Sequence, residues 1–100
     1  MLHYVVVFTC AALLLRGLDA MTDESSIMHV LSQVGNIPLK SVCVMRNHES
    51  GLSLGYAFVE LYSLQDSAAL LDIISSLPFS LDIDGKAIMV SYARNTFSTV

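Results

Sequence analysis

The sequence has few of the residues that mark a metal-binding, secreted or strongly basic protein. It contains no tryptophan, two cysteines and two prolines in 100 residues. Cys10 and Cys43 form no CxxC motif and have no histidines at zinc-ligand spacing, so we expect reduced thiols and no metal. Five basic residues against nine acidic ones give a formal charge of −4, which argues against a generic polyanion binder.

The chain also lacks the constellations that carry catalysis. No nucleophile–base pair, carboxylate pair or phosphate-binding loop is recognisable, so we predict no enzyme activity and no cofactor. The apolar content of 54% excludes a disordered chain and is sufficient for the core of one domain. The apolar run that begins at Tyr4 is too short for a transmembrane helix. We therefore expect a monomeric domain without a membrane partner.

The first twenty residues leave several interpretations open. A signal peptide cleaved after Ala20 is one of them, but no basic residue precedes the apolar run, and cleavage would remove the predicted strand Leu13–Leu15. Otherwise we interpret residues 1–10 as an artefact of the gene prediction, as an extension of that strand or as a segment that packs loosely on the domain. We divide the chain into an unassigned apolar extension at 1–11, a domain at 12–94 and a tail at 95–100.

Two helices are predicted between stretches of strand pattern. Thr22 is expected to cap the first, with Asp23 and Glu24 in its first turn, and Gly35 ends it. Ser63 begins the second in a capping-box-like pattern with Asp66, and Pro78 lies beyond its end. Their apolar residues recur at helical spacing: Ile27, Val30, Leu31 and Val34 in the first, and Leu70, Leu71 and Ile74 in the second.

Four main strands complete the pattern, at Leu13–Leu15, Val42–Met45, Gly55–Leu61 and Ala87–Tyr92. Leu81 and Ile83 alternate with polar residues before Asp84-Gly85, a strong hairpin turn. The order is β-α-β-β-α-β. It predicts an α+β, ferredoxin-like fold with a four-stranded antiparallel sheet and both helices on one face.

The most informative strand is Gly55–Leu61. With Leu54 it fits five of the seven constrained positions of K/R-G-F/Y-G/A-F-V-x-F/Y, a signature of RNA-binding strands. Alternation places Ala57, Val59 and Leu61 on one face, and Tyr56, Phe58 and Glu60 on the other. Two aromatic rings on a solvated sheet can stack nucleic-acid bases, whereas the structural alternative is a strand whose aromatic residues are buried.

The same alternation predicts the rest of the bare sheet face. Leu14 should lie there from the first strand, Cys43 and Met45 from the second, and Met89 and Ser91 from the last. A contiguous exposed apolar patch of this kind implies a partner surface. Arg16 and Arg94 lie at strand ends beside it and are candidates for contacts with phosphates or bases.

The order of elements over residues 12–94 resembles an RNA recognition motif. More narrowly, it looks like the second such motif of the OCRE- and G-patch-containing splicing regulators, RNA-binding proteins five, six and ten. The stretches that carry the likeness are Ser26-Ile27-Met28, Met45-Arg46-Asn47, Ser50-Gly51, Gly55-Tyr56-Ala57-Phe58-Val59-Glu60, Leu64-Gln65-Asp66, Ile83-Asp84-Gly85-Lys86 and the spacing to Tyr92-Ala93.

The resemblance implies single-stranded RNA binding, pyrimidine-rich for some members, and nuclear pre-mRNA splicing with splicing-factor partners within a longer protein. It makes Leu14, Arg16, Met45, Tyr56, Phe58, Met89, Ser91 and Arg94 the expected RNA-binding residues. Two departures weaken binding: Leu14 replaces the first-strand aromatic residue, and Leu54 replaces a basic residue. The alternative is a protein-interaction module on a degenerate version of the fold, for which Asp23 and Glu24 offer some acidity.

Overall fold

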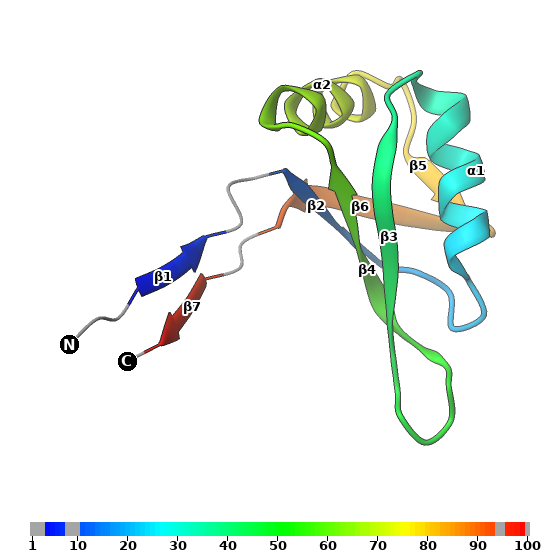
Figure 1. Ribbon diagram of the computed structural model, residues 1–100. Helices are drawn as coiled ribbons and strands as arrows, with labels where there is room; N and C mark the ends of the chain where they lie inside the picture. The colour runs from blue at the N-terminus through cyan, green and yellow to red at the C-terminus, as the bar shows by residue number, and fades with distance from the viewer. Residues whose placement is uncertain (1–3, 8–10, 94–95, 100) are drawn as a thin grey trace.

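The structure, a computed structural model, describes the backbone of residues 4–7, 11–93 and 96–99 and the side chains of residues 11–93. Its main body is a five-stranded antiparallel sheet in the order β3-β4-β2-β6-β5 with two helices on one side (Figure 1). The elements are β2 (Ala12–Arg16), α1 (Glu24–Val34), β3 (Leu39–Arg46), β4 (Ser53–Leu61), α2 (Leu64–Ser75), β5 (Leu81–Ile83) and β6 (Lys86–Tyr92). In addition, β1 (Tyr4–Val7) pairs with β7 (Thr96–Thr99).

The predicted α+β, ferredoxin-like class is confirmed, with one strand more in the main sheet than expected. The extra strand is β5, which pairs with β6 through a two-residue turn that places Ile83 opposite Lys86. Asp84 and Gly85 have φ of 51° and 80°, the positive values that tight hairpin turns require. The turn was predicted correctly, but the predicted count of four strands left out its short first arm.

The first helix begins one residue later than the sequence suggests. Asp23, and not Thr22, is the N-cap, because its Oδ1 accepts a hydrogen bond of 2.9 Å from the backbone N–H of Ser26. Thr22 is instead buried, and its hydroxyl donates to Oδ2 of Asp84 at 2.7 Å. Thr22 thus joins the entry to α1 to the β5–β6 turn, a contact across the fold that capping preferences cannot predict.

The second helix begins as predicted. The Ser63 hydroxyl accepts a hydrogen bond of 3.0 Å from the backbone N–H of Asp66. The four predicted strands all extend beyond their predicted bounds, because backbone pairing continues past the apolar segments that marked them.

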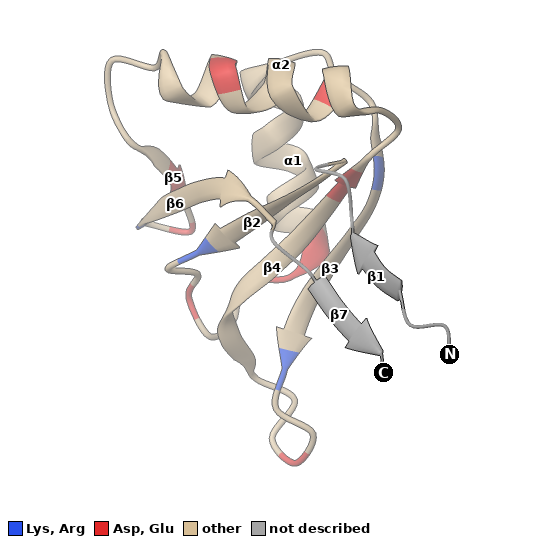
Figure 2. Ribbon diagram, turned by 90° about the vertical axis from the view of Figure 1, so that its left-hand side faces the viewer, with Lys and Arg blue, Asp and Glu red and all other residues tan. Residues whose placement is uncertain are grey.

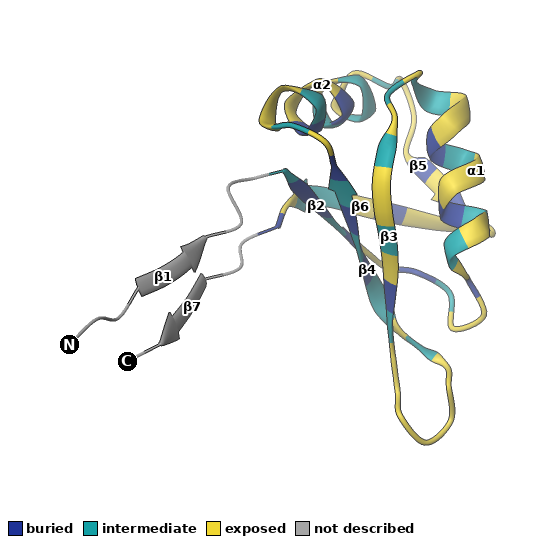
Figure 3. Cartoon of the chain, viewed as in Figure 1, coloured by how far each residue is buried: buried dark blue, intermediate teal, exposed yellow. Residues whose placement is uncertain are grey.

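The core lies between the helices and one face of the sheet (Figure 3). Leu13, Leu15, Ala57 and Val59 on the two central strands are each 0% exposed. Ile27 and Leu31 of α1 and Leu70 of α2 pack against this face in one cluster of buried residues. The helices therefore cover one face of the sheet, and within residues 11–93 no layer covers the other, so a site on the second face is held by a rigid scaffold.

Candidate nucleic-acid interface

The sheet face that the helices leave uncovered, which we call the open face, carries two rows of side chains across neighbouring strands. In the first row Phe58 of β4 lies opposite both Cys43 of β3 and Leu14 of β2, and Leu14 lies opposite Ser91 of β6. Strands lie about 4.8 Å apart, so the four side chains extend over roughly 14 Å. This row brings together three of the predicted binding residues, Leu14, Phe58 and Ser91, beside Cys43.

The second row lies one repeat along the strands. Arg16, the last residue of β2, lies opposite Tyr56 on one side and Met89 on the other. Tyr56 is partly buried, whereas Arg16 is exposed and Met89 is 64% exposed. Residues two apart on a strand are about 6.6 Å apart, so the two rows are roughly one extended nucleotide from each other. The open face thus combines aromatic, aliphatic and cationic groups at a spacing that suits successive bases.

The two aromatic rings are perpendicular to each other. The centroids of Tyr56 and Phe58 are 6.0 Å apart and their planes meet at 88°. Edge-to-face pairs of this kind contribute about 0.5–1.5 kcal/mol, which holds both rings in place. In this arrangement two flat groups could not stack in parallel on both rings.

Two glycines join the open face to the end of β2. Gly55 precedes Tyr56 with φ of 95°, and its carbonyl accepts hydrogen bonds of 2.9 Å from the N–H groups of Gly17 and Leu18. A Cβ on Gly17 would lie 3.0 Å from the carbonyl oxygen of Ala87, and its φ of 92° also disfavours a side chain. The glycine of the RNA-binding signature therefore fixes how β4 approaches β2, and with it the placement of Tyr56 beside Arg16.

Arg46, the last residue of β3, forms an ion pair within the domain. Its guanidinium forms a bidentate ion pair with Glu24, in which both hydrogen bonds are 2.8 Å long. Oε2 of Glu24 also accepts from the backbone N–H of Val44 at 3.0 Å. These bonds to the ionised form, first that from Arg46, lower the pKa of Glu24 to about 2. Glu24 therefore ties α1 to the edge strand β3, and Arg46 is not available to bind phosphate.

Lys40 is also paired. Its Nζ lies 3.5 Å from Oε2 of Glu60, and Oε1 of Glu60 accepts a hydrogen bond of 3.0 Å from the Ser41 hydroxyl. A register shift in β3 between Leu39 and Ser41 brings both partners to the same carboxylate. The carboxylate of Glu60 is thus held on the open face of β4, two residues beyond Phe58.

The remaining basic residues divide by position. Within residues 11–93, Arg16 is the open-face cation for which the structure shows no carboxylate partner. Lys86 is exposed, but it alternates with Ile88 and so lies on the helix side of β6. Figure 2 shows the blue basic segments at the ends of β2 and β3. Arg94 lies outside the described residues.

The other expected binding residues are less central. Met45 is partly buried and lies at the register shift between Val44 and Arg46, at the sheet edge. Leu54, where the signature has a basic residue, is 53% exposed. Cys43 is an exposed free thiol of the first row, and Cys10 lies outside the described residues. The structure thus brings Leu14, Arg16, Tyr56, Phe58, Met89 and Ser91 into one surface and leaves Met45 at its margin.

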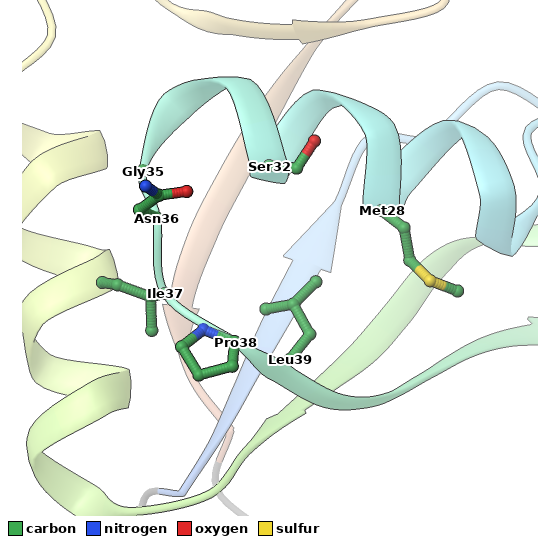
Figure 4. A pocket seen from close by; sticks show the side chains of 7 residues that line it. All are labelled: Met28, Ser32, Gly35, Asn36, Ile37, Pro38 and Leu39. Carbon is green, nitrogen blue, oxygen red and sulfur yellow. The ribbon is translucent and has the colours of Figure 1, made fainter.

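A separate hollow of about 450 Å³ lies at the C-terminal end of α1, away from these rows (Figure 4). Its lining has no charged side chain, so the hollow does not suit a phosphate. The lining residues are Met28, Ser32, Gly35, Asn36, Ile37, Pro38 and Leu39. Among the described residues no group of three or more His, Cys, Asp or Glu side chains could hold a metal ion. None of the helices in the described part of the chain is long and apolar enough to cross a membrane.

Comparison with known proteins agrees with this geometry. RNA-binding protein 5-B of Xenopus laevis is 28% identical over 88 residues, which are 88% of this chain and 12% of the relative. The solved Sex-lethal RNA recognition domains 1 and 2 of Drosophila melanogaster are 26% identical, with a TM-score of 0.65 over 84% of this chain and 50% of theirs. A solved Sxl-lethal protein/RNA complex is also 26% identical, with a TM-score of 0.69 over 85% of this chain and 47% of its own. No protein-family model matches.

Residues 11–93 have the fold of an RNA recognition motif domain and resemble such domains in sequence. RNA recognition motifs are not enzymes, and the prediction of a non-catalytic domain is confirmed through this relationship. The chain spans about an eighth of the length of the curated relative described above. An RNA recognition motif offers its open sheet face to RNA, which makes the two rows the candidate interface.

Sequence reasoning identified most of this surface, because period-two alternation assigns residues to faces. It missed the pairing of Arg46 with Glu24 and of Lys40 with Glu60, which decides which cations are free. Glu60 was predicted on the correct face, but its contacts with Lys40 and Ser41 depend on the register shift in β3. No signal within a single strand predicts such a shift.

Proposed function

We propose that the domain binds single-stranded RNA by stacking bases on Phe58 and Tyr56, with Leu14, Met89 and Ser91 completing the contact surface and Arg16 contacting phosphate. The observation that carries the proposal is the pair of rows across β4, β2 and β6 on a face that no helix covers. Aromatic groups on a rigid sheet stack with any base, because every base has a π-face. The names of the related proteins support the same ligand.

The affinity should be low for one domain. Stacking contributes about 1–3 kcal/mol per base, so two rings supply roughly 2–6 kcal/mol, whereas a micromolar complex needs about 8 kcal/mol. Backbone hydrogen bonds and Arg16 must provide the rest, since Lys40 and Arg46 are engaged. We expect dissociation constants of tens of micromolar or weaker and a shallow salt dependence.

Fluorescence anisotropy with labelled single-stranded RNA tests the proposal. Phe58→Ala should weaken binding about 5- to 150-fold, the equivalent of one lost stacking contact. Phe79→Ala is the matched control, because Phe79 is 72% exposed and lies between α2 and β5, away from the open face. Equal affinity of wild type and Phe58→Ala would refute base stacking on this surface.

We further propose that the physiological RNA is nuclear pre-mRNA and that the domain contributes to splice-site choice within a longer protein. The likeness to RNA-binding protein 5 supports this, together with the short share of that relative that the chain spans. Crosslinking of the full-length protein in nuclei, followed by sequencing of the bound RNA, tests the proposal. Enrichment of intronic sequences near splice sites is expected, and crosslinks confined to mature cytoplasmic mRNA would contradict it.

The second candidate function is protein recognition on the helix side. A groove of about 420 Å³ beside α1 includes Val30, Val34 and Leu77, and Phe79 stands exposed at its edge. However, the acidic residues expected to recruit a basic peptide are engaged within the domain: Glu24 pairs with Arg46, and Asp23 caps α1. The groove alone therefore supports this function less well than the open face supports RNA binding.

A further inference from the structure

Glu60 is a carboxylate on a face otherwise suited to stacking. It follows Phe58 by two residues and lies opposite Ser41 of β3. Its side chain is 41% exposed, so solvent and ligands can reach it. The negative charge of Glu60 repels phosphate. The Glu60 carboxylate is held in position by the hydrogen bond of 3.0 Å from the Ser41 hydroxyl and by Lys40, whose Nζ is 3.5 Å away. A fixed acceptor beside a stacking ring is suited to reading the edge of a base.

The distance fits that role. Alternate residues on a strand are about 6.6 Å apart, which is comparable with the width of a base. A base that stacks on Phe58 can therefore direct one edge at the Glu60 carboxylate. Since a carboxylate has about four lone-pair sites and Ser41 and Lys40 use two of them, acceptor capacity remains for the base.

The chemistry of the base edges decides which base fits. An ionised carboxylate can only accept hydrogen bonds. The Watson–Crick edge of guanine presents two adjacent N–H donors, whereas cytosine and adenine present one amino donor beside an acceptor nitrogen. Uracil presents a single N–H between two carbonyl oxygens, which the carboxylate repels. Because unstacked RNA bases are read on this edge, a carboxylate ranks guanine first and uracil last.

We propose that Glu60 selects the base that stacks on Phe58 and favours guanine over uracil at that position. This inference rests on the proposed RNA binding and adds a base preference to it. The same carboxylate disfavours phosphate near Lys40, so the RNA backbone runs along the Arg16 side of the face. Glu60 then acts as the specificity residue, while Lys40 and Ser41 position it.

The test uses the full chain and three pentanucleotides, UUUUU, UUCUU and UUGUU, with binding measured by anisotropy. Wild type should bind UUGUU about fivefold or more tightly than UUUUU, the lower limit for one good two-bond base contact. Glu60→Gln should reduce this ratio to about one, because an amide presents a donor beside an acceptor and so pairs with uracil as well as with guanine. Glu49→Gln in the β3–β4 loop is the control, since it makes the same change of charge at an exposed position.

The ratio of affinities separates base reading from charge. Glu60→Gln also frees Lys40, but any phosphate contact that Lys40 gains is common to all three RNAs and leaves their ratio unchanged. A guanine-to-uracil ratio that is equal in wild type and Glu60→Gln would overturn the inference while leaving RNA binding intact. If none of the three RNAs bound to wild type, or if Phe58→Ala bound all three as tightly as wild type, the proposed function itself would fail.

Discussion

The two faces of the main sheet are built from neighbouring residues of the same strands and differ in almost every property. Leu13 and Leu15 of β2 are 0% exposed beneath the helices, whereas Leu14 between them is only partly buried on the open face. On β4, Ala57 and Val59 are 0% exposed, and the larger rings of Tyr56 and Phe58 lie on the other side. On β4 the smaller aliphatic side chains therefore pack beneath the helices, and the larger aromatic rings lie on the open face.

This contrast shows how one strand can carry stability and recognition without conflict. Alternation directs each residue to one task, and the close packing under the helices fixes the strand that presents the other. The charged side chains also differ between the helix side and the open face. Glu24 and Arg46 bind each other where α1 meets the edge strand, whereas no carboxylate of residues 11–93 pairs with Arg16 beside Tyr56.

The largest expected effect is on stability and comes from adjacent leucines. Leu15→Ala should lower the free energy of unfolding by about 2–5 kcal/mol, because it leaves a cavity in a close-packed core. Leu14→Ala should cost less than about 1.5 kcal/mol, since its side chain is already partly in solvent. Urea unfolding followed by circular dichroism measures both, and equal losses would contradict the assignment of faces.

Glu24→Gln tests the tie between α1 and the sheet edge. In the folded domain the pKa of Glu24 is lowered from 4.5 to about 2, so the ionised form stabilises the fold. This stabilisation is complete above about pH 5 and is lost as the pH falls towards 2. We expect Glu24→Gln to cost about 1–2 kcal/mol at neutral pH, after allowance for solvent screening, and to flatten the acid limb of the stability curve.

Urea midpoints between pH 2 and pH 6 measure this effect. Some pH dependence should remain in the variant, because the hydrogen bond from the Ser26 N–H also lowers the pKa of Asp23. Glu49→Gln, which changes an exposed loop carboxylate, should reproduce the wild-type curve. Superimposable curves for wild type and Glu24→Gln would show that the ion pair contributes nothing to folding.

The smallest effect concerns the salt dependence of RNA binding. Each neutralised phosphate on a single strand adds about 0.7 to the slope of log affinity against log salt. Arg16→Gln should reduce the slope by about that amount, whereas Arg46→Gln should leave it unchanged because Arg46 is already paired with Glu24. If Arg46→Gln reduced the slope as much as Arg16→Gln, the ion pair would have to open when RNA binds.

The sequence was sufficient for the fold and for most of the open face because both depend on local periodicity. Leu14, Tyr56, Phe58, Met89 and Ser91 all lie on the predicted face, since their strands contain no irregularity between them. Contacts between distant elements were not predictable in the same way. The role of Thr22 depends on Asp84, which lies 62 residues further along the chain.

The orientation of the aromatic rings and the pairing of the charged side chains were also not predictable from the sequence. The perpendicular arrangement of Tyr56 and Phe58 depends on side-chain rotation, which no sequence pattern encodes. The ion pair between Arg46 and Glu24 depends on a register shift in β3 and on the approach of α1. The sequence therefore predicted which residues share a surface, and only the structure distinguished the free groups from the engaged ones.

The most direct test of the account is an NMR titration of the full chain with short single-stranded RNA. Chemical-shift changes should be concentrated on Leu14, Arg16, Tyr56, Phe58, Met89 and Ser91, with the core residues and the helix side little affected. Changes confined to Val30, Val34 and Phe79 would transfer the binding site to the helix side. No change at any residue with millimolar RNA would show that the open face does not bind RNA.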